Sequence, residues 1–142
     1  MMITALMALQ LATTQPPPPS ALPVPFTELP QQVLEPGQCA LFLWDRASGK
    51  RIAMLGRTPA TLRAIIDGRS TDLPAQAREG EEVMGFAPIS RFRSANRSFE
   101  VRLTILPATA GGAVVRDGSL TITEADGSAL VLPVAGLAGC PQ

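Results

Sequence analysis

The chain of 142 residues contains no histidine and no tyrosine, one tryptophan and two cysteines. Without histidine, a Ser-His-Asp triad, a Cys-His pair and every imidazole metal site are excluded. One Trp and five scattered Phe residues are also fewer than carbohydrate-binding faces and single-stranded nucleic-acid platforms use. The sequence therefore predicts no catalytic residue, no metal ligand and no cofactor, and we expect a protein that is not an enzyme.

The chain also lacks net charge and long apolar runs. Lys plus Arg and Asp plus Glu both number 12, so no net field attracts nucleic acid or an anionic membrane surface. The first apolar run, residues 3–12, is about half the length that spans a bilayer. We therefore expect no nucleic-acid partner and no transmembrane segment in the mature chain.

That short apolar run has the length of the central part of a signal peptide. It lacks a basic start, but residues 16–19 are four consecutive prolines, which separate it from the rest of the chain. The alternative is a buried helix of the domain. We predict a signal peptide in residues 1–14 and, because eight of the 14 prolines lie in residues 16–36, an extended proline-rich spacer in residues 15–36.

The two cysteines lie near the ends of the remaining sequence, residues 37–142. Cys39 begins the first clear strand pattern, and Cys140 lies two residues from the C-terminus. In an exported chain such a pair indicates one structural disulfide, whereas two reduced buried thiols are the alternative. We predict a Cys39–Cys140 disulfide and a periplasmic or secreted location.

Residues 37–142 alternate between apolar and polar side chains with a period of two, which is typical of β-strands. Residues 98–105 show this most clearly, and residues 120–123 and 130–134 form a predicted hairpin around Asp126-Gly127. Residues 39–44 are apolar on both faces, as in a central strand, and turn back into residues 51–55. Asp67-Gly68 and Asp117-Gly118 are further predicted turns.

Helix is expected only marginally, as one turn within residues 27–34 and at most two turns within residues 74–84. The predicted fold is therefore all-β: a small antiparallel barrel or sandwich of about seven to nine strands closed by one disulfide. In a closed barrel, residues 39–44 would pair with residues 129–134. A sandwich would place these two segments in different sheets.

Arg91, Arg93 and Arg97 form the densest basic cluster. If residues 89–93 are extended, Arg91 and Arg93 share one face while Phe92 points inward, and they can contact an anion or a partner. The favoured interpretation is a solvated strand face, because 11 of the 12 basic residues of this chain are Arg. Trp44 is expected in the core; an exposed Trp44 would instead indicate a contact surface.

No motif in the sequence specifies a reaction. The leading hypothesis is an exported, non-enzymatic β-domain that binds a macromolecular partner, an unknown protein or envelope component. The alternative is a small carrier that holds an apolar ligand inside a β-barrel. A deep apolar pocket would favour the carrier, and a filled interior with an exposed apolar patch would favour the partner-binding protein.

Overall fold

The computed structural model describes residues 24–141, which form one antiparallel sheet of ten strands. No helix occurs among these residues, so the all-β prediction is confirmed and the helical turn predicted within residues 27–34 is wrong. Residues 74–84, expected to form a loop with at most two turns of helix, contain a short strand and no helix. The strands are β1 (Phe26–Thr27), β2 (Ala40–Asp45), β3 (Arg51–Arg57), β4 (Ala60–Ile66), β5 (Arg69–Pro74), β6 (Ala77–Glu79), β7 (Ile89–Ser94), β8 (Arg97–Pro107), β9 (Ala113–Thr123) and β10 (Ala129–Gly139).

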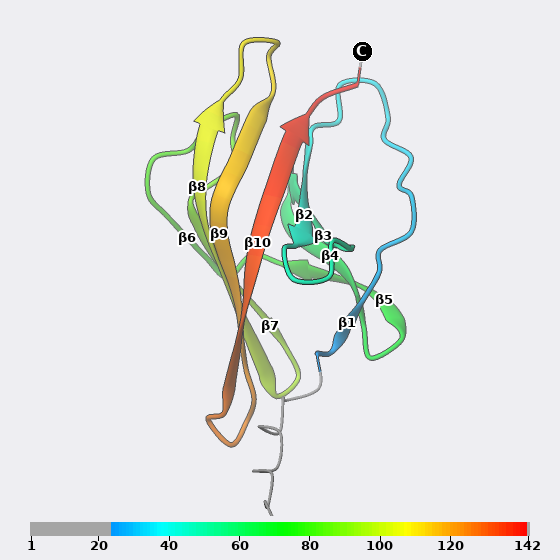
Figure 1. Ribbon diagram of the computed structural model, residues 1–142, viewed down its shortest axis with the longest axis vertical. Helices are drawn as coiled ribbons and strands as arrows, with labels where there is room; N and C mark the ends of the chain where they lie inside the picture. Colours follow the sequence, from blue (N-terminus) through cyan, green and yellow to red (C-terminus); the bar gives the residue numbers. More distant parts are fainter. Residues whose placement is uncertain (1–23, 142) are drawn as a thin grey trace, which may run out of the picture.

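The sheet curls around its core but is not closed (Figure 1). The order of the strands is β1-β4-β3-β2-β10-β9-β8-β7-β6. The tenth strand, β5, lies outside this order and pairs with β4. Between β5 and β6 the chain crosses from β4 to β7, at opposite ends of the sheet. There Ala75 N donates to Ala60 O of β4, and Gln76 N donates to Arg91 O of β7. Of the two predicted arrangements, the barrel is corrected because β5 and β7 do not pair, so the sheet is not closed. The sandwich is corrected because β2 and β10 pair within one sheet, and that open, curled sheet has ten strands instead of about seven to nine.

The pairing of β2 with β10 joins the first half of the sheet to the second. Ala40 lies opposite Gly139, and Asp45 lies opposite Val134. The predicted contact between these two strands therefore exists, but it uses residues 134–139 instead of residues 129–134. The extra length of β10 beyond the predicted strand end explains the difference, because its final residues continue the ladder up to the cysteine.

The concave side of the sheet forms a filled hydrophobic core. Phe99, Leu41, Leu43, Leu62 and Leu120 are at most 1% exposed, and burying a side chain of this size contributes about 1.5–3 kcal/mol. They come from four different strands, β2, β4, β8 and β9, so the alternation of each strand points one row of side chains into the same interior. Side chains from both halves of the sheet thus occupy the space that a carrier would need for a ligand.

Residues 28–38, here called the covering segment, lie on the outer face of β2, β3 and β4. Leu29 is 1% exposed and packs with Ala40 and Met54 in a second small core. Its backbone N–H donates to Arg51 O at 2.7 Å, and the Arg51 guanidinium donates back to Leu29 O. The folded domain therefore begins before residue 37, the start expected from the sequence, because buried side chains lie among the prolines of residues 15–36.

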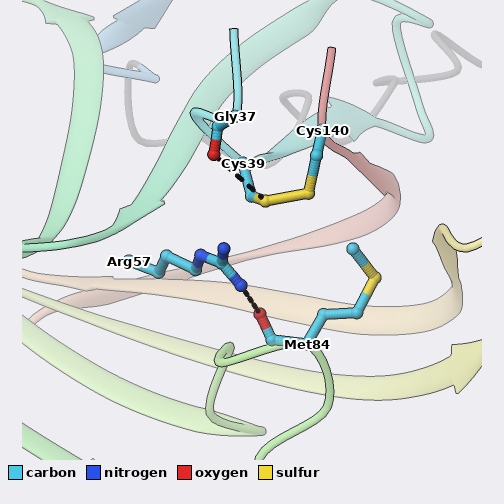
Figure 2. The surroundings of a disulfide bond; sticks show 5 residues. All are labelled: Gly37, Cys39, Arg57, Met84 and Cys140. Carbon is cyan, nitrogen blue, oxygen red and sulfur yellow. Dashed lines mark hydrogen bonds between the residues drawn. A yellow bond between two sulfur atoms is a disulfide. The ribbon is translucent and has the colours of Figure 1, made fainter. Parts of the chain in front are cut away.

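A disulfide joins Cys39 to Cys140, as predicted, with their Cα atoms 4.1 Å apart. It ties the start of β2 to the end of β10 at the upper end of the molecule (Figure 1). The Cys39 Sγ lies 3.8 Å from Gly37 O (Figure 2), and this contact is not a hydrogen bond because a disulfide sulfur has no proton to donate. Nearby, Arg57 Nη1 donates to Met84 O at 2.9 Å.

Two of the three predicted Asp-Gly turns are confirmed. Asp67 and Gly68 have φ angles of 49° and 79° in the β4–β5 hairpin, and Gly127 has a φ of 88° between β9 and β10. The third prediction is wrong, because Asp117 and Gly118 lie inside β9. Gly118 instead permits close packing: a Cβ there would lie 2.8 Å from Leu103 Cδ2.

Candidate binding surface

A row of apolar side chains crosses the outer face of four neighbouring strands near the upper end of the molecule. Leu137 of β10 lies opposite Phe42 of β2 on one side and Val114 of β9 on the other. Val114 in turn lies opposite Leu106 of β8. Leu137 is 54% exposed and Leu106 is 44% exposed, whereas Phe42 and Val114 are half-buried. The row is therefore open to solvent at β10 and β8 although its members are apolar.

A second row lies beside the first and contains Trp44, opposite Ala135. The Trp44 and Phe42 rings are 6.4 Å apart between centroids. We call these six residues the apolar patch: Phe42, Trp44, Leu106, Val114, Ala135 and Leu137. A shallow hollow of about 560 Å³ lies over the part of the patch formed by β2, β9 and β10, with a mostly apolar lining that includes Trp44 and Leu137 and two arginines, Arg46 and Arg116.

The covering segment ends the patch on one side. It covers the outer face of β2–β4, where Phe42 contacts the small core around Leu29. The Arg51 guanidinium lies 5.5 Å from the centroid of the Phe42 ring, a cation–π distance. The apolar outer face is thus shielded over β2–β4 and remains open to solvent over β10, β9 and β8.

An irregularity in the sheet shapes the patch. The register between β9 and β10 shifts between Val134 and Gly136. A Cβ on Gly136 would lie 2.7 Å from Phe42 O, so this position requires the close backbone approach that glycine allows. The extra residue of this shift lies in β9, where Val115 points into the core and Val114 outward. Ala135 and Leu137 continue the unbroken outward alternation of β10.

The lower half of the same outer face is polar. There Arg91 of β7, Glu100 of β8, Thr121 of β9 and Val131 of β10 lie in one cross-strand row. Arg91 donates to Glu100 at 2.9 Å, and Arg102 donates to the same carboxylate at 2.6 Å. These two guanidinium groups, Arg102 first, hold the pKa of Glu100 below its ordinary value.

The three predicted arginines do not gather into one site. Arg91 and Arg93 share the outer face of β7 while Phe92 is 3% exposed and inward, as the alternation predicts. Arg91 also pairs with Glu79 at 2.7 Å. Arg97 has the strand phase of inward-facing Phe99 and lies at the lower end of the molecule. A contact of these arginines with an anion or a partner stays a prediction.

Arg97 joins three turns of the lower end. It pairs with Asp67 of the β4–β5 turn, and its Nε donates to Glu124 after β9 at 2.9 Å. Hydrogen bonds to Asp67 and then Glu124 raise the pKa of Arg97. Arg97 also lines a hollow of about 680 Å³. Its guanidinium group is already paired with Asp67 and Glu124, so we assign it the structural role of holding these turns together.

Trp44 departs from the sequence prediction, since it is half-buried on the outer face instead of being part of the core. Leu106, Val114 and Leu137 were missed altogether. The signal that could have found them is a break in alternation: Leu106 follows Ile105, Val114 precedes Val115, and Leu137 precedes Ala138. Two adjacent apolar residues in a strand place one of them outside the core.

Within residues 24–141, no cluster of three or more His, Cys, Asp and Glu side chains is arranged to hold a metal ion. The same part of the chain contains no helix of sufficient length and hydropathy to cross a membrane. Comparison with family models, curated proteins and solved structures finds no match to this chain.

Proposed function

We propose that this chain is an exported, non-enzymatic β-domain that binds a protein partner through the apolar patch. The observation that carries the proposal is the exposure of Leu106 and Leu137 on either side of Val114, beside the only tryptophan of the chain. Contiguous exposed apolar patches are typical of interaction sites in monomeric proteins. Trp and Arg, both present here, are the residue types most enriched among those that dominate binding energy.

Two further observations support parts of the proposal. The buried interior counts against the carrier alternative, because large side chains such as Phe99 and Leu120, each at most 1% exposed, already fill it. The Cys39–Cys140 disulfide supports export, since disulfides persist in oxidising compartments and are rare in the cytosol. The periplasm and the outside of the cell both provide such conditions.

Site-specific photo-crosslinking in living cells tests the proposal with a matched pair of positions. Leu137 and Val131 both lie on the outer face of β10 and are 54% and 58% exposed, but only Leu137 belongs to the apolar patch. A photoreactive residue at position 137 should form a discrete crosslinked product that is absent at position 131. Substituting Leu106→Ser should remove that product, because it interrupts the patch from a neighbouring strand.

Equal crosslinking at the two positions, or a product at 137 that survives Leu106→Ser, would contradict the proposal. Folding is monitored by the resistance of the disulfide to a mild reductant, measured by alkylation of any thiols set free, and by β-sheet circular dichroism. The changes at positions 106, 131 and 137 all replace exposed side chains. Each should therefore change the free energy of unfolding by less than about 0.5 kcal/mol.

A further inference from the structure

The charges at the border of the apolar patch indicate which kind of partner it fits. Arg116 is exposed and forms no ion pair with another residue of the described range 24–141. Arg46 is 53% exposed in its side chain, and its Nη1 lies 3.6 Å from Asp117 Oδ1, a long and solvated contact. Two guanidinium groups thus border the hollow beside Trp44 with little neutralisation.

The nearby carboxylates do not offset both arginines. Asp45 is turned into the β2–β3 connection, where its carboxylate accepts hydrogen bonds from Ala47 N at 3.0 Å and Ser48 Oγ at 2.8 Å. The Asp117 side chain is 83% exposed, and its only ion pair among the described residues is the long contact with Arg46. The lining of the hollow therefore contains two arginines and no carboxylate, although Asp45 and Asp117 lie next to these arginines in the sequence.

We infer that the partner segment is a peptide with an apolar side chain flanked by carboxylates. The apolar side chain occupies the hollow against Trp44 and Leu137, and the carboxylates pair with Arg116 and Arg46. The inference rests on the proposed function and specifies its partner. Guanidinium groups bind carboxylates with two parallel hydrogen bonds, and charge complementarity of this kind selects partners and speeds association.

Two other occupants fit the same surface less well. Recognition of anionic lipid by basic side chains uses clusters of about four to eight Lys or Arg residues, and the border of the patch has two. A second copy of this chain would bring the same two arginines to the interface, and the lining of its hollow contains no carboxylate to receive them. Its nearest exposed carboxylate, Asp117, already contacts Arg46 of its own chain. An acidic and apolar peptide satisfies both the apolar hollow and its charged border.

Because Trp44 is the only tryptophan, its fluorescence reports directly on the patch of the full mature chain. The probes are a short synthetic peptide with Leu flanked by Asp and a twin with Lys in place of each Asp. The acidic peptide should shift Trp44 emission to the blue and bind at least about tenfold more tightly than its twin. Added NaCl should weaken this binding, because salt screens exposed charges.

Charge reversal provides the matched control. Arg116→Glu should abolish or reverse the preference for the acidic peptide, whereas Arg93→Glu, at an exposed arginine outside the patch, should leave it unchanged. Leu137→Ser should abolish binding of the acidic peptide. These variants alter exposed residues, and native Trp44 emission without peptide confirms that each is folded.

Several outcomes would overturn the inference. Equal binding of the two peptides, with both lost in Leu137→Ser, would reject the acidic partner and leave the proposed function intact. A blue shift with vesicles of phosphatidylglycerol but not with either peptide would identify a lipid surface instead. Concentration-dependent dimers in sedimentation, lost in Leu137→Ser and without peptide binding, would identify a second copy. No saturable response to peptide, vesicle or self-association would reject the inference as well.

Discussion

The outer face of β8, β9 and β10 is apolar in its upper half and polar in its lower half, although the same three strands form both. In the lower half, Glu100 pairs with Arg91 and Arg102, and Thr121 separates it from Val131. In the upper half, Leu106, Val114 and Leu137 replace such groups. The inner face of these strands is buried in the core whether the outer face is apolar or polar. Burial of the core therefore does not explain why the upper half of the outer face is apolar.

A second comparison concerns the apolar outer face itself, which is covered in one place and open in another. Over β2–β4 the chain supplies its own cover, and Leu29 is 1% exposed there. Over β10, Leu137 is 54% exposed. The covered part contributes to stability through burial, and the open part is available for the same kind of contact with another molecule.

The largest expected effect comes from the disulfide, which holds the upper end and not the lower one. Replacing Cys39 and Cys140 together with Ser removes a bond that closes a loop of 101 residues. The free energy of unfolding should fall by up to about 5 kcal/mol, with unchanged strand content. In urea titrations followed by hydrogen exchange, amides of residues 40–42 should lose protection before those of residues 98–100. Uniform loss would refute this division.

A smaller effect separates the covered from the open apolar surface. Leu29→Ala should lower the free energy of unfolding by about 3 kcal/mol, because it removes a buried side chain and leaves a cavity. Leu137→Ala should change it by less than about 0.5 kcal/mol. Val33→Ala, at a position 93% exposed in the same covering segment, is the control. Equal values for Leu29→Ala and Val33→Ala in urea unfolding would show that the covering segment is not part of the fold.

The smallest effect concerns the ion pairs of the lower half. The lowered pKa of Glu100 means that its charged form is stabilised in the folded chain. This contribution is present above the unfolded value of about 4.3 and disappears as pH falls through the lower folded value. Because these pairs are solvated, Glu100→Gln should cost about 0.5 kcal/mol at neutral pH. The difference from the native chain, measured by urea unfolding, should shrink as pH falls below the ordinary pKa of a glutamate and through the lowered pKa of Glu100. A difference that stays constant over this range would contradict this assignment.

The sequence predicted those parts of the fold that depend on local alternation and turn chemistry. Residues 98–105 and the Asp67-Gly68 turn are examples, and the placement of the two cysteines at the ends of the domain indicated their bond. The sequence did not predict that the sheet would remain open, because the crossing at Ala75 and Gln76 depends on hydrogen bonds to Ala60 and Arg91, which are distant in the chain.

The candidate site was harder to predict than the fold. Trp44 was expected inside because aromatic side chains are usually buried, and only the register with Ala135 shows that it lies on the outer face. Leu106, Val114 and Leu137 come from three strands, and their union into one row depends on two pairings. Leu29 was assigned to a spacer because prolines around it suggest an extended chain, which is compatible with packing flat against a sheet.

Radical footprinting of solvent-exposed side chains tests the central claim most directly, because it measures the two halves of the outer face in one experiment. Oxidation of Leu106, Leu137 and Val131 is compared between the purified chain and the same chain in intact cells. The account predicts that Leu106 and Leu137 become protected in cells while Val131 is oxidised to the same extent in both samples. Protection of Val131 equal to that of Leu137, or no protection at any of the three, would contradict a partner-binding role for the apolar patch.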